Sequence, residues 1–148
     1  MNALVSKFLW RGVAGGVVLG GLLLGGSALY ANGENAGGHE RPLFTAKLPN
    51  VPGKSLTAVL VHYEPGGKSP KHAHAGSVFA YVLSGSIRSE NSATGPAKVY
   101  ATGEAFFEPP GSVHLVSENG SSTEPASLLA IFVADDGAQL TKPQKQVP

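Results

Sequence analysis

The chain has 148 residues, of which 42% are hydrophobic and only 14% are charged. Eleven Lys and Arg residues against ten Asp and Glu give a formal net charge of +1, which excludes the strongly basic surface typical of nucleic-acid binding. Because the chain contains no cysteine, disulfides and thiolate metal sites are excluded, and any metal ligands have to be nitrogen or oxygen atoms. Twenty glycines and eleven prolines indicate many turns and short strands, as in an all-β protein.

Residues 1–31 are predicted to be an export segment. The first eleven residues carry two basic side chains and no acid, and an uncharged stretch rich in Val, Leu and Gly follows them. Cleavage of a signal peptide after Ala28 or Ala31 is our first interpretation, and an uncleaved membrane anchor is the alternative. Either way, the folded domain is expected to be periplasmic or secreted and to contact a membrane only through this segment. The basic residues argue against a third interpretation, a buried helix of a cytoplasmic protein.

The remaining chain divides into a linker, one domain and a tail. Residues 32–42 are rich in Gly and Asn and are predicted to be a flexible linker, and the polar residues 135–148 are predicted to be a flexible tail. Between them, residues 43–134 contain short β-rich runs separated by turn residues, which predicts a sandwich or jelly roll without helices. The predicted strands cover residues 57–63, 78–84, 86–90, 97–101, 105–108, 113–117 and 127–134.

Three histidines have the spacing of a metal site. His72 and His74 are one residue apart, so on a strand both side chains point to the same face. His114 comes about forty residues later, after a Pro-Pro-Gly turn, where an antiparallel partner strand would place it opposite the first pair. Three neutral imidazoles can bind a divalent ion and leave coordination positions open. Taken alone, the pair His72 and His74 is explained equally well as two surface histidines on a strand.

The residues around these histidines resemble the two motifs of the cupin superfamily, over a span of about residues 60–119. The matching residues are Gly66, His72, His74 and Gly85 in the first motif and Gly103, Pro109, Gly111 and His114 in the second. The resemblance implies a single cupin jelly-roll β-barrel in which three histidines hold a metal ion. It fails at two positions: the family's glutamate ligand falls at Val78, and its asparagine falls at Glu118, with Asn119 one place late.

Glu108 is the candidate to replace the missing carboxylate, as a fourth metal ligand or as a catalytic general base. Strand alternation places it on one face with Glu104 and Phe106, and exposure of that carboxylate to solvent is the interpretation we favour. His62 is treated only as a residue that could support the ligands, and His39, in the linker, is expected to have no specific role. Four phenylalanines are expected to line the barrel, namely Phe79, Phe106, Phe107 and Phe132.

The resemblance leaves three functions open. The first is an exported enzyme that uses a divalent transition metal, Fe, Mn, Ni or Zn, on a small organic molecule, with dioxygenase-like or isomerase- or decarboxylase-like chemistry. The second is a non-catalytic barrel that binds a small ligand or metal, which the valine at position 78 favours. The third is a structural barrel whose histidines bind nothing. A homodimer is reasonable by the same resemblance, because cupin barrels often pair.

Overall fold

The computed structural model describes residues 36–144 of the chain. The predicted export segment, residues 1–31, therefore lies outside the described residues. Within residues 36–144, no helix is long and apolar enough to cross a membrane.

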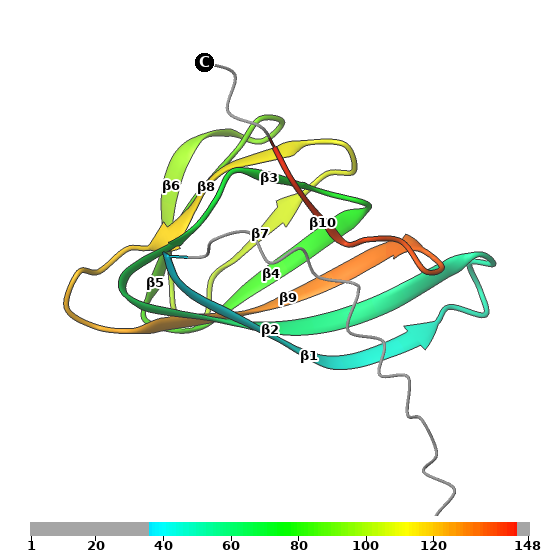
Figure 1. The fold of residues 1–148 in the computed structure, drawn as a ribbon, viewed down its shortest axis with the longest axis horizontal. Helices are drawn as coiled ribbons and strands as arrows, with labels where there is room; N and C mark the ends of the chain where they lie inside the picture. Colours follow the sequence, from blue (N-terminus) through cyan, green and yellow to red (C-terminus); the bar gives the residue numbers. More distant parts are fainter. Residues whose placement is uncertain (1–35, 145–148) are drawn as a thin grey trace, which may run out of the picture.

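Ten β-strands account for the regular structure of the described residues (Figure 1). They are β1 (Ala36–Lys47), β2 (Lys54–Ser69), β3 (His72–His74), β4 (Ser77–Ser84), β5 (Ser86–Asn91), β6 (Gly95–Ala101), β7 (Ala105–Glu108), β8 (Val113–Asn119), β9 (Ala126–Asp135) and β10 (Thr141–Pro143). All strand pairs are antiparallel. The prediction of an all-β jelly roll is thus confirmed.

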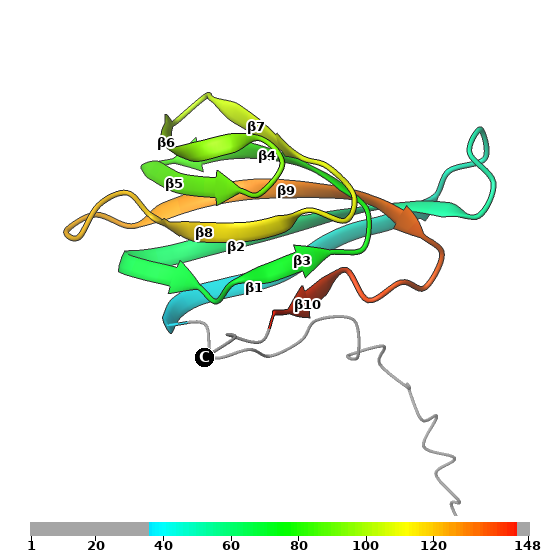
Figure 2. The ribbon, with the colours of Figure 1, turned by 90° about the horizontal axis from the view of Figure 1, so that it is seen from above.

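The strands form two layers that are joined through β2. One layer has the order β1-β2-β9-β4-β7, and the other has the order β10-β3-β8-β5-β6. In Figure 2 the layers overlie one another, and in each the strands follow this order from the bottom of the view to the top. The end of β2 leaves the first layer and pairs with β8 through Lys68 and Ser69. This junction makes the two layers a nearly closed barrel.

The hydrophobic core lies between the layers and follows from strand alternation. On β2, β4 and β9 every second residue is buried, as expected for strands with one face inside the barrel. The buried residues of these three strands include Val59, Val61, Tyr63, Val78, Ala80, Val82, Leu128, Ala130, Phe132 and Ala134. Removal of this apolar surface from water is the dominant favourable contribution to folding.

The outer face of the β1-β2-β9-β4-β7 layer carries an apolar row that no other described strand covers. Strand register places Phe44, Ala58, Ile131, Phe79 and Phe107 side by side across the five strands. The three phenylalanines of this row are exposed, with 58%, 44% and 50% of their surface accessible for Phe44, Phe79 and Phe107. The prediction that Phe79 and Phe107 line the barrel is therefore wrong, whereas Phe132 is buried in the core.

Both predicted flexible segments contain strand structure where they are described. Residues 36–42 form the first part of β1, which pairs with β2 along nearly its whole length, so they are not a linker. Residues 141–143 form β10, which pairs with β3, and the side chain of Leu140 is buried in the core. In both cases, pairing with a neighbouring strand orders a segment of weak intrinsic strand propensity.

Candidate metal centre

The structure brings His72, His74 and His114 together inside the barrel. His72 on β3 pairs directly with His114 on β8. The ring centroid of His72 lies 4.7 Å from that of His74 and 5.0 Å from that of His114. One potential ligand atom of each of the three residues lies within 4.8 Å of those of the other two. His72 and His114 are buried, with 9% and 4% of their surface accessible. The arrangement expected from the spacing of the histidines is present.

A tight turn and a β-bulge place His114 in the interior. Gly111 has a φ of 77°, a left-handed conformation that glycine adopts without strain, and it closes the turn that leads into β8. On β5, Glu90 pairs with Val116 and the next residue, Asn91, pairs with His114, so Leu115 is an extra residue in β8. Because of this bulge, His114 and Ser117, three residues apart, are both buried.

Backbone carbonyls orient two of the imidazoles. His72 donates its Nδ1–H to the carbonyl oxygen of Pro70 over 2.6 Å, and His74 donates its Nδ1–H to that of Leu140 over 3.3 Å. Both rings therefore keep Nε2 as a free acceptor, the arrangement that metal-binding histidines usually show. The Nε2 of His114 accepts a hydrogen bond from Ser89 Oγ over 2.9 Å, and its Nδ1 faces Glu108.

Glu108 belongs to this cluster, and its favoured interpretation as a solvent-exposed carboxylate is wrong. Only 3% of its surface is accessible. Its Oε2 lies 3.1 Å from Nδ1 of His114 and 3.8 Å from Nε2 of His74, and it accepts a hydrogen bond from Asn91 Nδ2 over 3.1 Å. Glu108 on β7 pairs directly with Val78 on β4, so its side chain enters the barrel beside the position where the cupin motif has glutamate.

The cluster fits a divalent transition metal by its donor chemistry. Three imidazole nitrogens and one carboxylate oxygen suit Fe, Mn, Ni or Zn. Ligand atoms bound at about 2.1 Å to one ion lie about 3 Å apart when they are neighbours in its coordination sphere. The 3.1 Å separation between Glu108 and Nδ1 of His114 is close to this value, and in the metal-free site it is a hydrogen bond whose proton the ion would replace.

Burial and neighbouring groups shift the pKa values of His72, His74 and Glu108. Burial lowers the pKa of His72 to about 4, with further lowering by the neighbouring His74 and His114, and burial also lowers the pKa of His74. For Glu108, burial raises the pKa, but the hydrogen bond from His114 and the adjacent imidazoles outweigh it, and the net pKa is below the usual value. At neutral pH the site therefore offers neutral His72 and His74 and an ionised carboxylate, which are the forms that bind metals.

A cavity of about 40 Å³ adjoins the four side chains. A water molecule needs roughly 10 to 15 Å³ by the same kind of measure, so the cavity has space for a few water molecules or a ligand of comparable size. Most of its wall is apolar and comes from β2, β4, β7 and β9, including Val59, Val78, Phe106, Leu128 and Phe132. A ligand in this space would be largely shielded from solvent.

The other two histidines lie away from the cluster. His62 and His39 pair with each other across β1 and β2, and the imidazole of His62 lies 3.4 Å from Glu64 in an exposed contact. His62 therefore does not support the ligands, and the separation of His39 from the site agrees with the expectation. Sequence reasoning missed Ser89 and Asn91, because their proximity to His114 and Glu108 depends on the pairing of β5 with β8.

The chain is similar to known proteins in sequence and in structure. The cupin domain family matches residues 59–132, half of the chain. Germin-like protein 5-1 of Oryza sativa subsp. japonica is 36% identical over 107 residues, which are 66% of this chain and 46% of the relative. The rhicadhesin receptor of Pisum sativum is 34% identical, over 59% of this chain and 42% of the receptor. The chain thus spans less than half the length of these relatives.

Two solved structures share the fold at low sequence identity. The polyketide cyclase RemF from Streptomyces resistomycificus superposes with a TM-score of 0.57 and 20% identity, over 76% of this chain and 75% of RemF. An RmlC-like cupin from Shewanella frigidimarina superposes with a TM-score of 0.53 and 22% identity, over 71% of this chain and 83% of that protein. With the family match, the barrel and the two histidine motifs in agreement, the chain belongs to the cupin superfamily.

Proposed function

We propose that this domain binds one divalent transition metal ion through His72, His74, His114 and Glu108 and uses it in a reaction on a small organic molecule. The observation that carries the proposal is the convergence of three imidazoles and a buried carboxylate on the wall of a largely apolar cavity. When bound, the ion would supply Lewis acidity, or redox chemistry if it is Fe or Mn. Dioxygenase-like and isomerase- or decarboxylase-like reactions are both compatible with this donor set.

The protein's own groups have separable roles in this proposal. The carbonyls of Pro70 and Leu140 fix the tautomers of His72 and His74, and the apolar wall limits the access of water. Glu108 is also the candidate general base, because it is a buried carboxylate at hydrogen-bond distance from His114. A carboxylate that is fully engaged by the metal and by Asn91 would instead act only as a ligand.

A non-catalytic barrel that binds a small ligand or the metal itself is the second candidate. The mainly apolar cavity wall, with few groups able to transfer protons, favours it. Metal retained at one equivalent per chain, together with no turnover of diketones, thiols, flavonols or sugar acids, would support this binder over the enzyme.

Export of the domain is also a proposal, and it depends on residues 1–31. N-terminal sequencing of the protein recovered from the periplasm or culture medium tests it. A new N-terminus at residue 29 or 32 is the expected result, and recovery of the full chain from the cytoplasm alone would contradict export.

The metal site is tested by substitution of its ligands. His72→Ala and His114→Ala should each lower metal affinity at least about tenfold, because one nitrogen donor is lost. His39→Ala is the matched control, since His39 is an exposed histidine on the outer face of β1. Metal affinity is measured by competition with a chelator of known strength at pH 7.5. Equal losses in all three variants would show that the site is assigned to the wrong residues.

A further inference from the structure

A second polar cluster lines the cavity, apart from the metal ligands. The hydroxyl oxygen of Tyr63 is 2.7 Å from Ser69 Oγ and 2.8 Å from Ser117 Oγ. These three residues line the same cavity as His72 and Glu108. Tyr63 and Ser117 are buried, with 2% and 7% of their surface accessible. We call Tyr63, Ser69 and Ser117 the hydroxyl cluster.

The hydroxyl cluster has one proton more than its internal contacts use. Each hydroxyl carries one O–H and can also accept hydrogen bonds. The two contacts between the oxygens of Tyr63, Ser69 and Ser117 use two of the three protons. Burial raises the pKa of Tyr63 more than the two serine hydrogen bonds lower it, so the phenol keeps its proton at neutral pH. One O–H of the cluster is therefore left to donate to an oxygen atom in the cavity.

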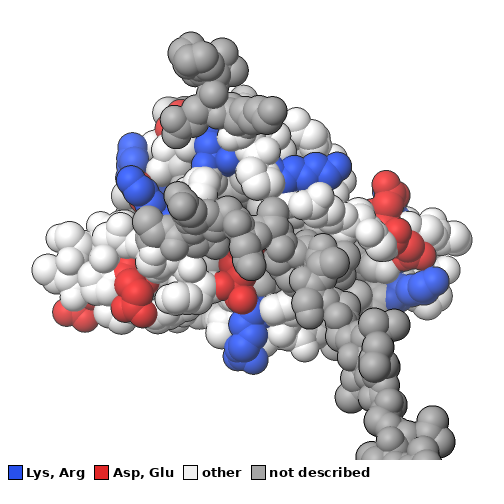
Figure 3. Space-filling model, in the orientation of Figure 1, with Lys and Arg blue, Asp and Glu red and all other residues white. Residues whose placement is uncertain are grey.

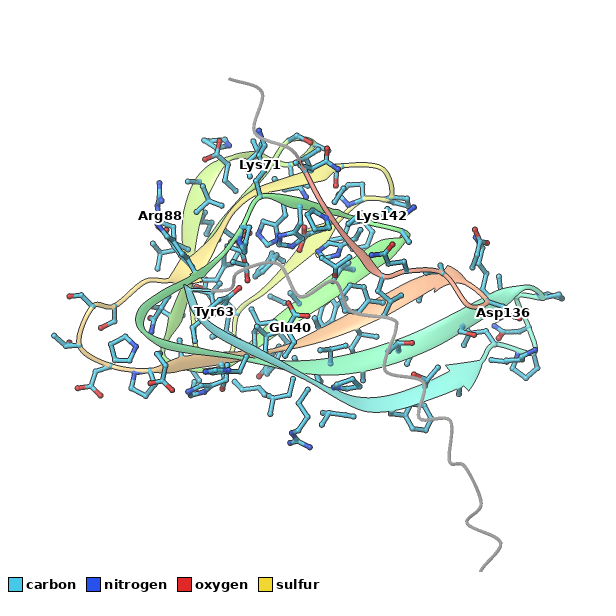
Figure 4. All side chains as sticks on the ribbon, viewed as in Figure 1. Glu40, Tyr63, Lys71, Arg88, Asp136 and Lys142 are labelled. Carbon is cyan, nitrogen blue, oxygen red and sulfur yellow. The ribbon has the colours of Figure 1, made fainter. Side chains whose placement is uncertain are left out.

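Glu40 supplies a hydrogen-bond acceptor on another part of the wall. It pairs with Val61, whose side chain is in the core, so the side chain of Glu40 also faces inward and lines the cavity. Figure 4 shows Glu40 and Tyr63 near the middle of the barrel. Although the residue as a whole is exposed, burial of its carboxyl group raises the pKa of Glu40, which makes it a better proton acceptor than a fully hydrated carboxylate.

The charge balance of the cavity limits the ligands that it can hold. Its described lining contains two acids, Glu40 and Glu108, and neither Lys nor Arg. The basic residues Lys71, Arg88 and Lys142 lie towards the margins of the molecule in Figure 4. Two carboxylates would balance the charge of one divalent ion. A dianionic ligand would add two uncompensated negative charges in a place where water screens them poorly.

We infer that the cavity takes a small uncharged hydroxycarbonyl compound, whose hydroxyl donates to Glu40 and whose oxygen accepts from the hydroxyl cluster, and that it disfavours dicarboxylates. The inference rests on the proposed metal centre and adds the class of its ligand. The cavity volume of about 40 Å³ restricts the ligand to a few non-hydrogen atoms.

Three probes of similar size and increasing charge test this inference: hydroxyacetone, glycolate and oxalate, which carry zero, one and two negative charges at neutral pH. Binding to the full chain loaded with Mn(II) is followed by water proton relaxation, and free Mn(II) in the filtrate shows whether a probe removes the metal. The comparison is between variants rather than between probes, so the intrinsic chelating strength of oxalate cancels.

Glu40→Gln removes one negative charge from the cavity wall and should strengthen oxalate binding relative to hydroxyacetone by about tenfold. Tyr63→Phe and Ser69→Ala, which disrupt the hydroxyl cluster, should each weaken hydroxyacetone binding by about fivefold. Glu64→Gln is the control, because Glu64 is exposed and pairs with His62 outside the cavity, and it should change neither affinity.

The outcomes separate this inference from the proposed function. A wild-type chain that retains no Mn(II), Fe(II), Ni(II) or Zn(II) overturns the metal centre and the ligand class together. The ligand class alone is overturned if the chain retains metal and two results are found together. The ratio of oxalate to hydroxyacetone affinity is then the same in Glu40→Gln as in wild type, and neither Tyr63→Phe nor Ser69→Ala weakens hydroxyacetone binding.

Discussion

At the scale of single residues, the most informative feature is the position of the buried carboxylate. It lies on β7, whereas the cupin motif has it on the paired strand β4. Val78 occupies the position where the cupin motif has glutamate, and it cannot bind a metal. Glu108 lies directly opposite on β7, and paired residues on one face have Cβ atoms only about 5 Å apart. Its carboxylate therefore reaches the histidines from the neighbouring strand, and the site keeps one acidic group.

Whether the two strand positions are equivalent can be tested by moving the carboxylate from Glu108 to position 78. Glu108→Gln should lower metal affinity by about ten- to a hundredfold, because a neutral amide replaces the charged oxygen donor. The double variant Val78→Glu with Glu108→Val returns the carboxylate to β4 and should recover most of that loss. Metal affinity is measured by chelator competition, and circular dichroism verifies the fold.

Glu104→Gln provides the control for the swap, because Glu104 lies in the turn before β7 and is exposed. If Glu108→Gln binds metal as tightly as Glu104→Gln does, Glu108 is not a ligand. If the swapped variant stays as weak as Glu108→Gln, the two strand positions are not equivalent.

The convergence of the three histidines was predictable at this scale, whereas the position of Glu108 was not. The spacing of His72 and His74 and the turn before His114 are local patterns, and they indicate a shared face without any knowledge of the sheet. The burial of Glu108 depends on which strand β7 pairs with and on Asn91, which comes from β5. Local alternation alone cannot decide whether the face that Glu108 shares with Phe106 points to the core or to water.

At the scale of elements, the seven strands predicted from the sequence all exist, and the three that were missed are pairing-dependent. β1 contains two glycines and a proline and is ordered along the edge of β2. β3 and β10 have three residues each, and β10 ends in proline. Such segments have little strand propensity of their own, so they can be recognised as strands only from their pairing with a neighbouring strand. The bulge at Leu115 is likewise visible only in the pairing of β5 with β8.

β10 is expected to support the metal centre although it supplies no ligand. The carbonyl of Leu140 accepts the Nδ1–H of His74, and β10 pairs with all three residues of β3. A chain that ends after residue 138 should therefore bind metal about tenfold more weakly. It should also be less stable by roughly 2 kcal/mol or more, since the buried Leu140 side chain is lost.

The matched control is a chain that ends after residue 144, which keeps β10. Denaturant titration and chelator competition on both chains give the two quantities. Unchanged metal affinity in the shorter chain would show that the orientation of His74 does not depend on β10.

At the scale of the whole molecule, the stability of the metal-free protein should depend on pH through His72. Its pKa is 6.5 when unfolded and about 4 when folded, so between these values the unfolded chain binds a proton that the folded chain does not. The free energy of unfolding should be fully retained above pH 6.5 and should fall as the pH decreases towards 4, by at most roughly 3 kcal/mol at about 1.4 kcal/mol per pKa unit.

The lowered pKa values of His74 and Glu108 act in the same direction, because protonation of either group favours the unfolded state. Urea titrations of the metal-free protein between pH 4 and pH 7.5 measure the effect. A His72→Gln variant should show a smaller decrease with acid, and an equal decrease in this variant would assign the effect to other groups.

We propose that the molecule associates with a second copy through one face. Figure 3 shows both basic and acidic side chains on the visible side, and the acidic group at its right end has a basic side chain beside it. The outer face of the β1-β2-β9-β4-β7 layer presents the row from Phe44 to Phe107, which carries no charge. Two copies of such a row can meet across a twofold axis without opposing like charges, so we expect a homodimer.

Sedimentation velocity tests the expected dimer. Phe79→Lys with Phe107→Lys should convert it to a monomer, since four buried lysines would face one another across the axis. Val99→Lys on β6 is the control, because Val99 is also an exposed apolar residue, with 51% of its surface accessible, but lies in the other layer. A monomeric wild-type chain would contradict the expectation.

The pairing of Val78 with Glu108 also means that two adjacent strands of this barrel offer positions from which a carboxylate can reach the histidines. A barrel with acids at both positions would keep a carboxylate beside the histidines if either acid were replaced. Lineages of the superfamily that lack the β4 glutamate are therefore places to look for an acid on the adjacent strand.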